Sequence, residues 1–188
     1  DDTNGHDNLN ISEIKSAIDN STTFSSENKL DLIGFDACLM QTYEIGLELS
    51  SLADVMVASK DLEPGDGWDY QGFLGSLARN SYASAATLGG YIVDSYDNWY
   101  NSSTETLSSV DLRKYQAIDD AISSFNTAAL TVSGSDWLSI DDAAENAWSS
   151  SNWSYGWDGE ERDLGQFFKY ISVNASSNDL KTAASAVL

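Results

Sequence analysis

The chain has 188 residues, of which 41% are hydrophobic and 11% aromatic, so it can build a packed core and is not a disordered segment. Thirty acidic residues against nine basic ones give a formal charge of −21, which argues against nucleic acid as a partner and favours basic peptides. No stretch approaches the roughly 18 unbroken apolar residues of a membrane span, and a single cysteine excludes an internal disulfide.

The spacing of apolar residues predicts the elements in chain order. A helix is expected over 11–18, a short buried strand over 30–35, a second helix over 39–49 and a second strand over 54–59. A strand, a helix and a strand this close together are typical of the βαβ unit of an α/β sheet. The rest reads as mainly helical, with a strand conceivable at 106–111, a surface loop at 149–159 and helices at 72–79, 83–99, 113–130, 141–148 and 163–173.

The single cysteine, Cys38, follows the first predicted strand at the point where the chain turns toward the next helix. The carboxyl ends of strands are where α/β sheets bind ligands. A thiol at a helix N-terminus would also feel the positive end of the helix dipole, which favours the thiolate. A lone cysteine is more often a small buried hydrophobe, so its position alone leaves both interpretations open.

The sequence around this cysteine is more specific. Three segments, Phe-Asp-Ala-Cys-Leu-Met at 35–40, Ala-Asp-Val-Met-Val-Ala-Ser at 53–59 and Leu-Glu-Pro-Gly-Asp-Gly-Trp-Asp-Tyr at 62–70, together resemble the clostripain family. This is a group of secreted cysteine peptidases with a caspase-like fold. The resemblance is continuous over about 31–70 and weaker back to residue 1. It implies an α/β fold, a caspase-like sheet flanked by helices, of which this chain supplies the C-terminal part and a mainly helical extension.

The resemblance also implies a division of labour along the chain. Residues 1–80 would carry the nucleophile and the specificity pocket, and residues 81–188 would be a helical remainder of the same domain. Cys38 would attack the scissile carbonyl, and its backbone N–H would be one oxyanion donor. Asp36 and Asp66 would form an acidic pocket for the Arg or Lys before the cut. Ser59 would open a loop that flanks the substrate backbone, and Trp68 would cover the stem of a bound Arg.

Each of these residues also has a purely structural interpretation. Asp36 could cap the helix that follows the strand, and Asp66 could be an ordinary turn residue before Gly67. Trp68 could equally be a core aromatic. The combination of an Asp-Ala-Cys strand end with Glu-Pro-Gly-Asp-Gly-Trp favours the functional roles for Asp36 and Asp66.

A cysteine peptidase of this kind needs a histidine as general base, and His6 is the only one present. It lacks the preceding strand and the following glycine of the family's His-Gly pair, so we expect a surface residue. The resemblance implies that the base lies on a separate light chain, cut from the same secreted precursor, which also completes the sheet. The present chain, beginning at Asp1 with Cys38 close behind, would be the matching heavy chain.

The competing hypotheses concern partners and ions. An inactive relative could use the same acids as a binding or surface module for basic ligands, and an acidic helical scaffold would leave the cysteine loop unexplained. No cofactor is expected. Calcium is conceivable, with oxygen ligands at Asp61, Glu63 or 158–161, although no EF-hand pattern is present and a solvated acidic surface explains these residues as well.

Overall fold

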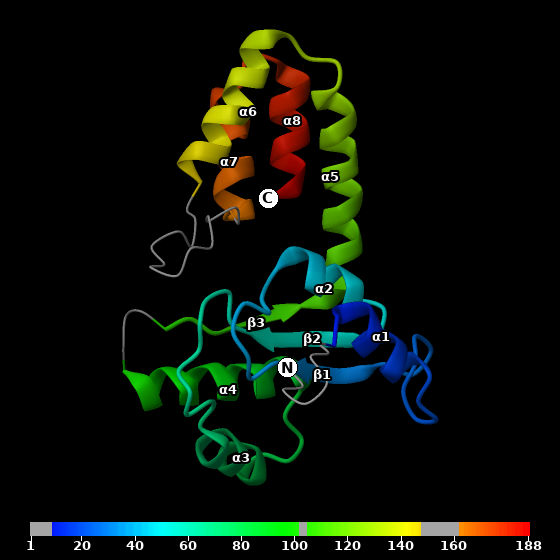
Figure 1. Cartoon of the computed structure of the whole chain (residues 1–188), viewed down its shortest axis with the longest axis vertical. Coiled ribbons are helices and arrows are strands. Elements are labelled where there is room, and N and C mark those ends of the chain that lie inside the picture. Colours follow the sequence, from blue (N-terminus) through cyan, green and yellow to red (C-terminus); the bar gives the residue numbers. More distant parts are fainter. Residues whose placement is uncertain (1–8, 102–104, 148–161) are drawn as a thin grey trace. The chain divides into compact units, whose positions relative to one another are not determined.

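The computed structural model describes residues 9–101, 105–147 and 162–188. The chain divides into two compact units, an N-terminal unit (Asp1–Gln116) and a C-terminal unit (Ala117–Leu188), whose elements are labelled in Figure 1. The sequence-based boundary at residue 80 lies elsewhere, inside the N-terminal unit. The helix beyond it, α4 (Ala85–Tyr100), packs against the sheet and therefore belongs with the strands.

The N-terminal unit is built on a three-stranded sheet in the order β1 (Leu30–Gly34), β2 (Ala53–Ala58) and β3 (Ser108–Asp111). Strands β1 and β2 are parallel and are joined through helix α2 (Tyr43–Leu49), which confirms the predicted βαβ unit. Strand β3 pairs with β2 in the antiparallel direction.

Side chains alternate between the two faces of β2, as the two-residue repeat of a strand requires. Met56 faces a cluster that includes Leu49 of α2 and Ile11 of α1 (Ile11–Asp19). Val57 faces a second cluster, formed with Phe73 of α3 (Tyr70–Arg79) and with α4. Helices therefore cover both faces of the sheet (Figure 1), which explains why β2 is apolar almost throughout.

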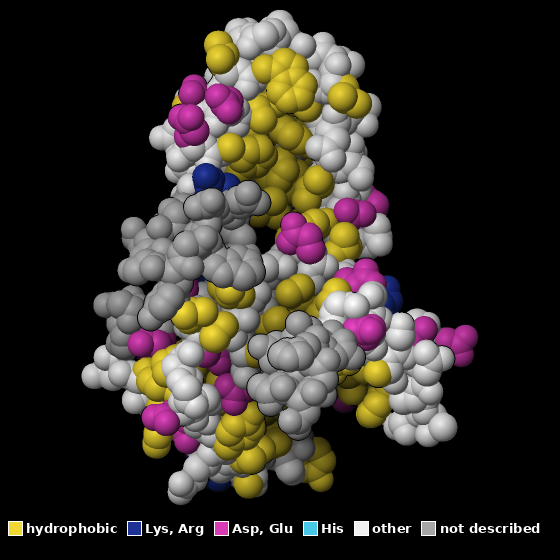
Figure 2. Space-filling model, viewed as in Figure 1, with side chains coloured by type: hydrophobic (Ala, Val, Ile, Leu, Met, Phe, Trp, Pro, Cys, Tyr) yellow, Lys and Arg dark blue, Asp and Glu magenta, His cyan; other side chains and the backbone are white. Residues whose placement is uncertain are grey.

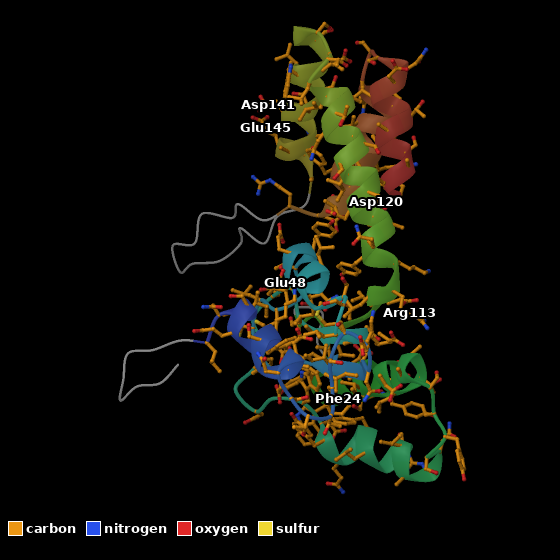
Figure 3. The ribbon with its side chains drawn as sticks, turned by 90° about the vertical axis from the view of Figure 1, so that its right-hand side faces the viewer. Phe24, Glu48, Arg113, Asp120, Asp141 and Glu145 are labelled. Atoms are coloured by element: carbon orange, nitrogen blue, oxygen red, sulfur yellow. The ribbon has the colours of Figure 1, made fainter. Side chains whose placement is uncertain are left out.

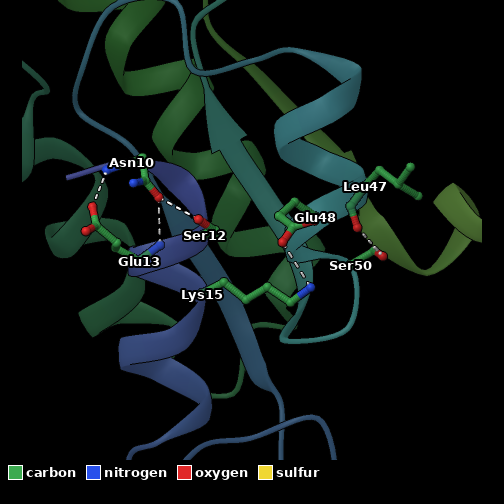
Figure 4. A network of polar contacts seen from close by, with 7 residues as sticks. All are labelled: Asn10, Ser12, Glu13, Lys15, Leu47, Glu48 and Ser50. Carbon is green, nitrogen blue, oxygen red and sulfur yellow. Dashed lines mark hydrogen bonds and ion pairs between the residues drawn. The ribbon is translucent and has the colours of Figure 1, made fainter. Parts of the chain in front are cut away.

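Helix α1 is fixed at its start and along its side (Figure 4). Asn10 Oδ1 accepts the backbone N–H of Glu13 at 3.0 Å, and Glu13 Oε2 accepts the backbone N–H of Asn10 at 2.9 Å, which forms a capping box. Lys15 Nζ lies 3.1 Å from Glu48 Oε1 on α2. Both side chains are partly exposed, so this ion pair orients the two helices more than it stabilises them.

The C-terminal unit is helical. A short 3₁₀ turn (Leu112–Lys114), still within the N-terminal unit, leads into α5 (Tyr115–Ala129). Helices α6 (Gly134–Asn146), α7 (Leu164–Asn174) and α8 (Asn178–Val187) follow. Phe125 of α5 meets Phe168 of α7 edge to face, with ring centroids 5.0 Å apart, and Leu180 of α8 is fully buried beside them. The sequence did not predict α8. Its start is marked by Ser177, whose hydroxyl accepts the Leu180 N–H at 3.3 Å.

One buried acid organises this unit. Asp136 on α6 is 4% exposed, and its Oδ1 accepts the backbone N–H groups of Ser176 at 2.7 Å and Ser177 at 2.9 Å. These two residues form the connection between α7 and α8. The carboxylate of Asp136 thus joins three helices through main-chain bonds.

The remaining acids are mostly on the surface. On the face drawn in Figure 2, acidic side chains are spread over both units, in keeping with the formal charge of −21. Asp141 and Glu145 lie exposed one turn apart on α6 (Figure 3). Within the residues that the structure describes, no helix is long and apolar enough to cross a membrane.

Candidate active site

Cys38 lies in the connection between β1 and α2, in a turn, with its side chain exposed. The helix expected from Leu39 onward begins only at Tyr43, where Thr42 Oγ1 accepts the N–H of Ile45 at 3.3 Å and caps the helix. The prediction that Cys38 lies at a helix N-terminus is therefore wrong, and the helix dipole is not what acts on the sulfur.

Main-chain bonds to the segment after β2 replace the expected helix. The N–H of Leu39 donates to the carbonyl of Asp61 at 3.1 Å, and the N–H of Gln41 donates to the carbonyl of Ser59 at 2.9 Å. Leu39 has a φ of 63°, in the left-handed region that a non-glycine residue rarely adopts. These bonds hold the residue after Cys38 in a conformation that excludes a helix.

The sulfur itself is held by the backbone of Glu63. The N–H of Glu63 points at Cys38 Sγ at 3.2 Å, and the carbonyl oxygen of Glu63 lies 3.8 Å from the same atom, within reach of the thiol proton. The N–H can donate to the sulfur of a thiolate, and the carbonyl can accept the proton of a thiol. The thiol therefore has a fixed direction although its side chain is exposed.

Asp36, two residues before the cysteine, turns its carboxylate toward the segment 67–70. Its Oδ2 accepts the backbone N–H of Trp68 at 3.2 Å and the hydroxyl of Tyr70 at 3.1 Å. Gly67, with a φ of +68°, lies so close that a Cβ there would be 2.7 Å from this oxygen. Because Thr42 caps α2, the interpretation of Asp36 as a helix cap is wrong.

Glu63 is a residue of this site that the sequence analysis missed, since it considered only a calcium ligand there. Its Oε2 accepts the indole N–H of Trp68 at 3.0 Å, whereas its Oε1 is buried and has no partner among the described residues. Burial, and then contact with the Asp36 carboxylate, raise the pKa of Glu63 to about 8. The signal was its place at the head of Glu-Pro-Gly-Asp-Gly-Trp.

Trp68 is the core aromatic of the two alternatives. It is 8% exposed and packs with Val57 and Phe73, while Tyr70 stacks on it at a centroid distance of 6.4 Å. A Cβ on Gly34 would come within 2.9 Å of the indole ring, so the glycine at the end of β1 makes room for it. The indole is therefore buried under Glu63, to which it donates a hydrogen bond, and a substrate cannot reach its ring.

Asp66 is exposed, in a turn closed by the N–H of Gly67 donating to the carbonyl of Pro64 at 3.0 Å. Tyr100 of α4 donates its hydroxyl to the carbonyl of Gly67 at 2.6 Å. Burial raises the pKa of Tyr100, and the charges of Asp66 and Asp36 raise it further. Asp36 lies against Gly67 and Trp68, the two residues that directly follow Asp66, so both acids belong to one part of the site.

Ser59 has no access to solvent. Its Oγ accepts the N–H of Asp61 at 3.0 Å and lies 2.9 Å from Thr106 Oγ1. The hydroxyl therefore fixes the bend that follows β2, and the structure does not bring it to the surface beside Cys38.

A pocket of about 430 Å³ adjoins the site on the side of α4. Tyr100 borders both the pocket and the site. The other polar side chains that can carry a charge in the pocket lining are those of Lys60, Asp94, Tyr96, Asp97 and Glu105. The Tyr96 hydroxyl is buried without a partner in the described part of the chain. Burial raises the pKa of Tyr96, and the negative charge of Glu63 raises it further.

His6 and the acidic run at 158–161 lie outside the described residues. Asp61 is buried, with Oδ1 accepting the N–H of Leu62 at 2.8 Å. Among the residues that the structure describes, no three His, Cys, Asp or Glu side chains are grouped so as to hold a metal ion.

Comparison with known proteins places the whole chain. The model of the clostripain family matches residues 1–188. No individually curated protein matches the sequence. Among solved structures, a clostripain from Bacteroides thetaiotaomicron, in complex with the peptide inhibitor BTN-VLTK-AOMK, is 14% identical, with a TM-score of 0.68 over 98% of this chain and 73% of that one.

Two further solved structures have the same fold. A secreted C11 cysteine protease from Bacteroides thetaiotaomicron, in complex with an irreversible peptide inhibitor, is 17% identical, with a TM-score of 0.63 over 100% of this chain and 48% of that one. An inactive zymogen of a C11 protease from Parabacteroides distasonis is 17% identical, with a TM-score of 0.59 over 95% of this chain and 45% of that one. The chain thus spans about half the length of these two proteins.

Proposed function

Because the chain belongs to the clostripain family of cysteine peptidases, we propose that it is the nucleophile-bearing part of an endopeptidase that cleaves after Arg or Lys. The observation that carries the proposal is the pairing of an exposed, oriented thiol with an acid two residues away. Cys38 Sγ is held by the backbone of Glu63, and the Asp36 carboxylate is held by the residues that follow in the same segment. The segment 63–68 therefore positions both the proposed nucleophile and the proposed cation site.

The chemistry assigned to Cys38 is acyl transfer. Its thiolate attacks the scissile carbonyl carbon, the amine of the leaving peptide takes a proton from the general base, and water then hydrolyses the thioester. The backbone N–H of Cys38 has no partner among the described residues, which leaves it available as an oxyanion donor. The general base is a histidine on the light chain.

An acidic pocket suits a cationic side chain before the cut. Asp36 lies against Gly67 and Trp68, the two residues that follow Asp66, and two carboxylates in one segment favour a guanidinium, which can bond to both at once. The inhibitor bound to the Bacteroides thetaiotaomicron clostripain has a peptide, VLTK, that ends in lysine. We expect Arg to be preferred over Lys where both acids contact the cation.

The unpaired edge of β1 is the argument for a separate light chain. Among the described residues β1 pairs only with β2, and its side chains are half exposed whereas those of β2 are almost all buried. Parallel sheets are normally covered and continued on both sides. A light chain from the same precursor would add strands at β1. Secretion is proposed by analogy with the relative described as a secreted protease, and processing with the one described as a zymogen.

The test is a panel of fluorogenic peptides that differ only in the residue before the cut, assayed on the full protein and on Asp36→Asn and Asp66→Asn. A charge pair of this kind contributes about 2–5 kcal/mol, so kcat/KM for Arg and Lys peptides should fall by roughly 30- to several-thousand-fold, far more than for neutral peptides. Cys38→Ala should abolish cleavage and leave the precursor as one chain. Equal cleavage after Arg, Leu and Asp would contradict the assignment of the acidic pocket, and full activity of Cys38→Ala would contradict Cys38 as the nucleophile. No cleavage by the full wild-type protein would leave it as a binding module.

A further inference from the structure

The carboxyl groups of Asp36 and Glu63 are both bonded to Trp68, beside Cys38, and the described residues supply too few donors to satisfy both as anions. Asp36 Oδ2 receives two hydrogen bonds, and Glu63 Oε2 receives one from the Trp68 indole. Glu63 Oε1 is buried and receives none from the residues that the structure describes. Two adjacent carboxylates repel each other, and a buried lone pair without a donor adds a further cost. A proton on Glu63 removes both penalties, because the carboxyl then donates to Asp36.

Among the described residues, no cation is one of the causes that shift the pKa of Glu63. The phenols of Tyr70, Tyr96 and Tyr100 all sense the charge of Glu63, and Glu105 acts on the last two of them. Asp66 is the next acid, acting on Tyr100. Lys60 lines the adjoining pocket, and it is not among the charges that act on the Glu63 carboxyl.

We propose that Glu63 is a third carboxyl group of the specificity site, which holds a proton against Asp36 while the site is empty and releases it to solvent when a substrate cation binds. This inference rests on the proposed function, since it needs a cation beside Asp36. The raised pKa of Glu63, at about 8, agrees with the protonated form in the empty site at neutral pH. Burial is its main cause, Asp36 the second, and the bond from Trp68 opposes both.

Proton release gives the site a measurable signature. A cation brought next to Asp36 and Glu63 supplies the missing positive charge, so the ionised form of Glu63 becomes favourable. Binding is then linked to the loss of one proton, and the affinity for a cation rises by up to about tenfold for each pH unit until the pKa is passed. Above about pH 8 the affinity should level off, because Glu63 is already ionised.

The experiment uses n-butylguanidine, which carries one positive charge throughout the range, as a competitive inhibitor of the full processed enzyme. Its Ki is measured from about pH 5.5 to about pH 9.5 against an Arg peptide, for the wild type, Glu63→Gln and the control Glu27→Gln. Glu27 is an exposed acid of the same unit, so its variant matches the change in net charge.

We expect the Ki of the wild type and of Glu27→Gln to fall with pH and to level near pH 8. In Glu63→Gln this bend should be absent. The two curves should converge at low pH, and by about pH 9 the wild type should bind roughly tenfold more tightly or better. A merely structural role of Glu63 would shift Ki equally at every pH. Any background from the catalytic Cys and His appears in both curves and cancels in their ratio.

A second variant guards against a folding defect in Glu63→Gln. Trp68→Phe removes the indole donor that stabilises ionised Glu63, so its bend should move to higher pH. Parallel wild-type and Glu63→Gln curves, or an unmoved bend in Trp68→Phe, would overturn the proposal while leaving the cation site intact. If n-butylguanidine does not compete, or if Asp36→Asn leaves its Ki unchanged near pH 9, the cation site itself is absent, and the proposed function falls with the inference.

Discussion

At the scale of single residues, the contact between Gly34 and Trp68 determines how the acids of the site are presented. The indole of Trp68 rests on the end of β1 and donates its N–H to Glu63, while the backbone N–H of the same residue donates to Asp36. Any side chain at Gly34 must displace the ring. A displaced ring moves the indole N–H away from Glu63, so one added methyl group alters the acidic site through a buried residue.

We therefore predict that Gly34→Ala lowers both stability and activity. Its Cβ would lie 2.9 Å from the indole, and overpacking of this kind costs about 1–3 kcal/mol in the free energy of unfolding. The control is Gly90→Ala, because a Cβ there meets no atom within 4 Å. Urea titration and kcat/KM for an Arg peptide are measured on both. Similar losses in the two variants would show that the contact with Trp68 is unimportant.

The residues of the site were predictable to different degrees. The positions of Cys38, Asp36 and Asp66 followed from the resemblance of their segments to a family, and the structure gathers the segments that carry them. The motif drew attention to the segment of Glu63 but not to its role, which depends on burial and on an oxygen without a partner among the described residues, and these are properties of the folded chain. Their catalytic roles remain predictions.

At the scale of elements, periodicity found β1, β2 and α1 within a residue or two. It failed where tertiary contacts override local preference. The apolar pattern after Cys38 is helical, yet the N–H groups of Leu39 and Gln41 bond to the segment after β2, and the helix starts only at Tyr43. Helix α8 was not predicted although Leu180, Ala183, Ala184 and Val187 recur at helical spacing, because alanine gives a weaker apolar signal than a larger side chain.

The link between α6 and the α7–α8 connection gives the second prediction. Asp136→Ala removes a buried acceptor of two backbone N–H groups, so the free energy of unfolding should fall by about 2–3 kcal/mol. Asp141→Ala on the exposed side of the same helix should change it by less than about 0.5 kcal/mol. Both are measured by urea denaturation monitored by circular dichroism. Equal midpoints would mean that water replaces the carboxylate at no cost.

At the scale of the whole molecule, the formal charge of −21 surrounds the site with a negative potential. Such a field attracts cationic peptides over distances that salt shortens, since the screening length is about 10 Å at 0.1 M and about 3 Å at 1 M. The field should therefore raise the capture of basic substrates at low salt without changing what the pocket prefers.

The third prediction separates this field from the pocket. Between about 0.02 M and about 0.5 M NaCl, kcat/KM for an Arg peptide should fall severalfold, and that for a neutral peptide should change little. Asp36→Asn removes one charge of the pocket but leaves the field almost intact, so its lower kcat/KM should keep nearly the same dependence on salt. Loss of the salt dependence in this variant would assign the whole effect to the pocket.

The bonds between Glu63 and Cys38 restrict how this enzyme can diverge. The stretch 61–68 positions the sulfur through its main chain and shapes the acidic site through its side chains. An insertion or deletion in this stretch would also move the main-chain groups that orient the sulfur of Cys38. Active relatives should therefore keep the length of the stretch. Engineering a new preference should accordingly proceed by exchanging side chains at Asp36 and Asp66, with the backbone of this stretch inherited unchanged.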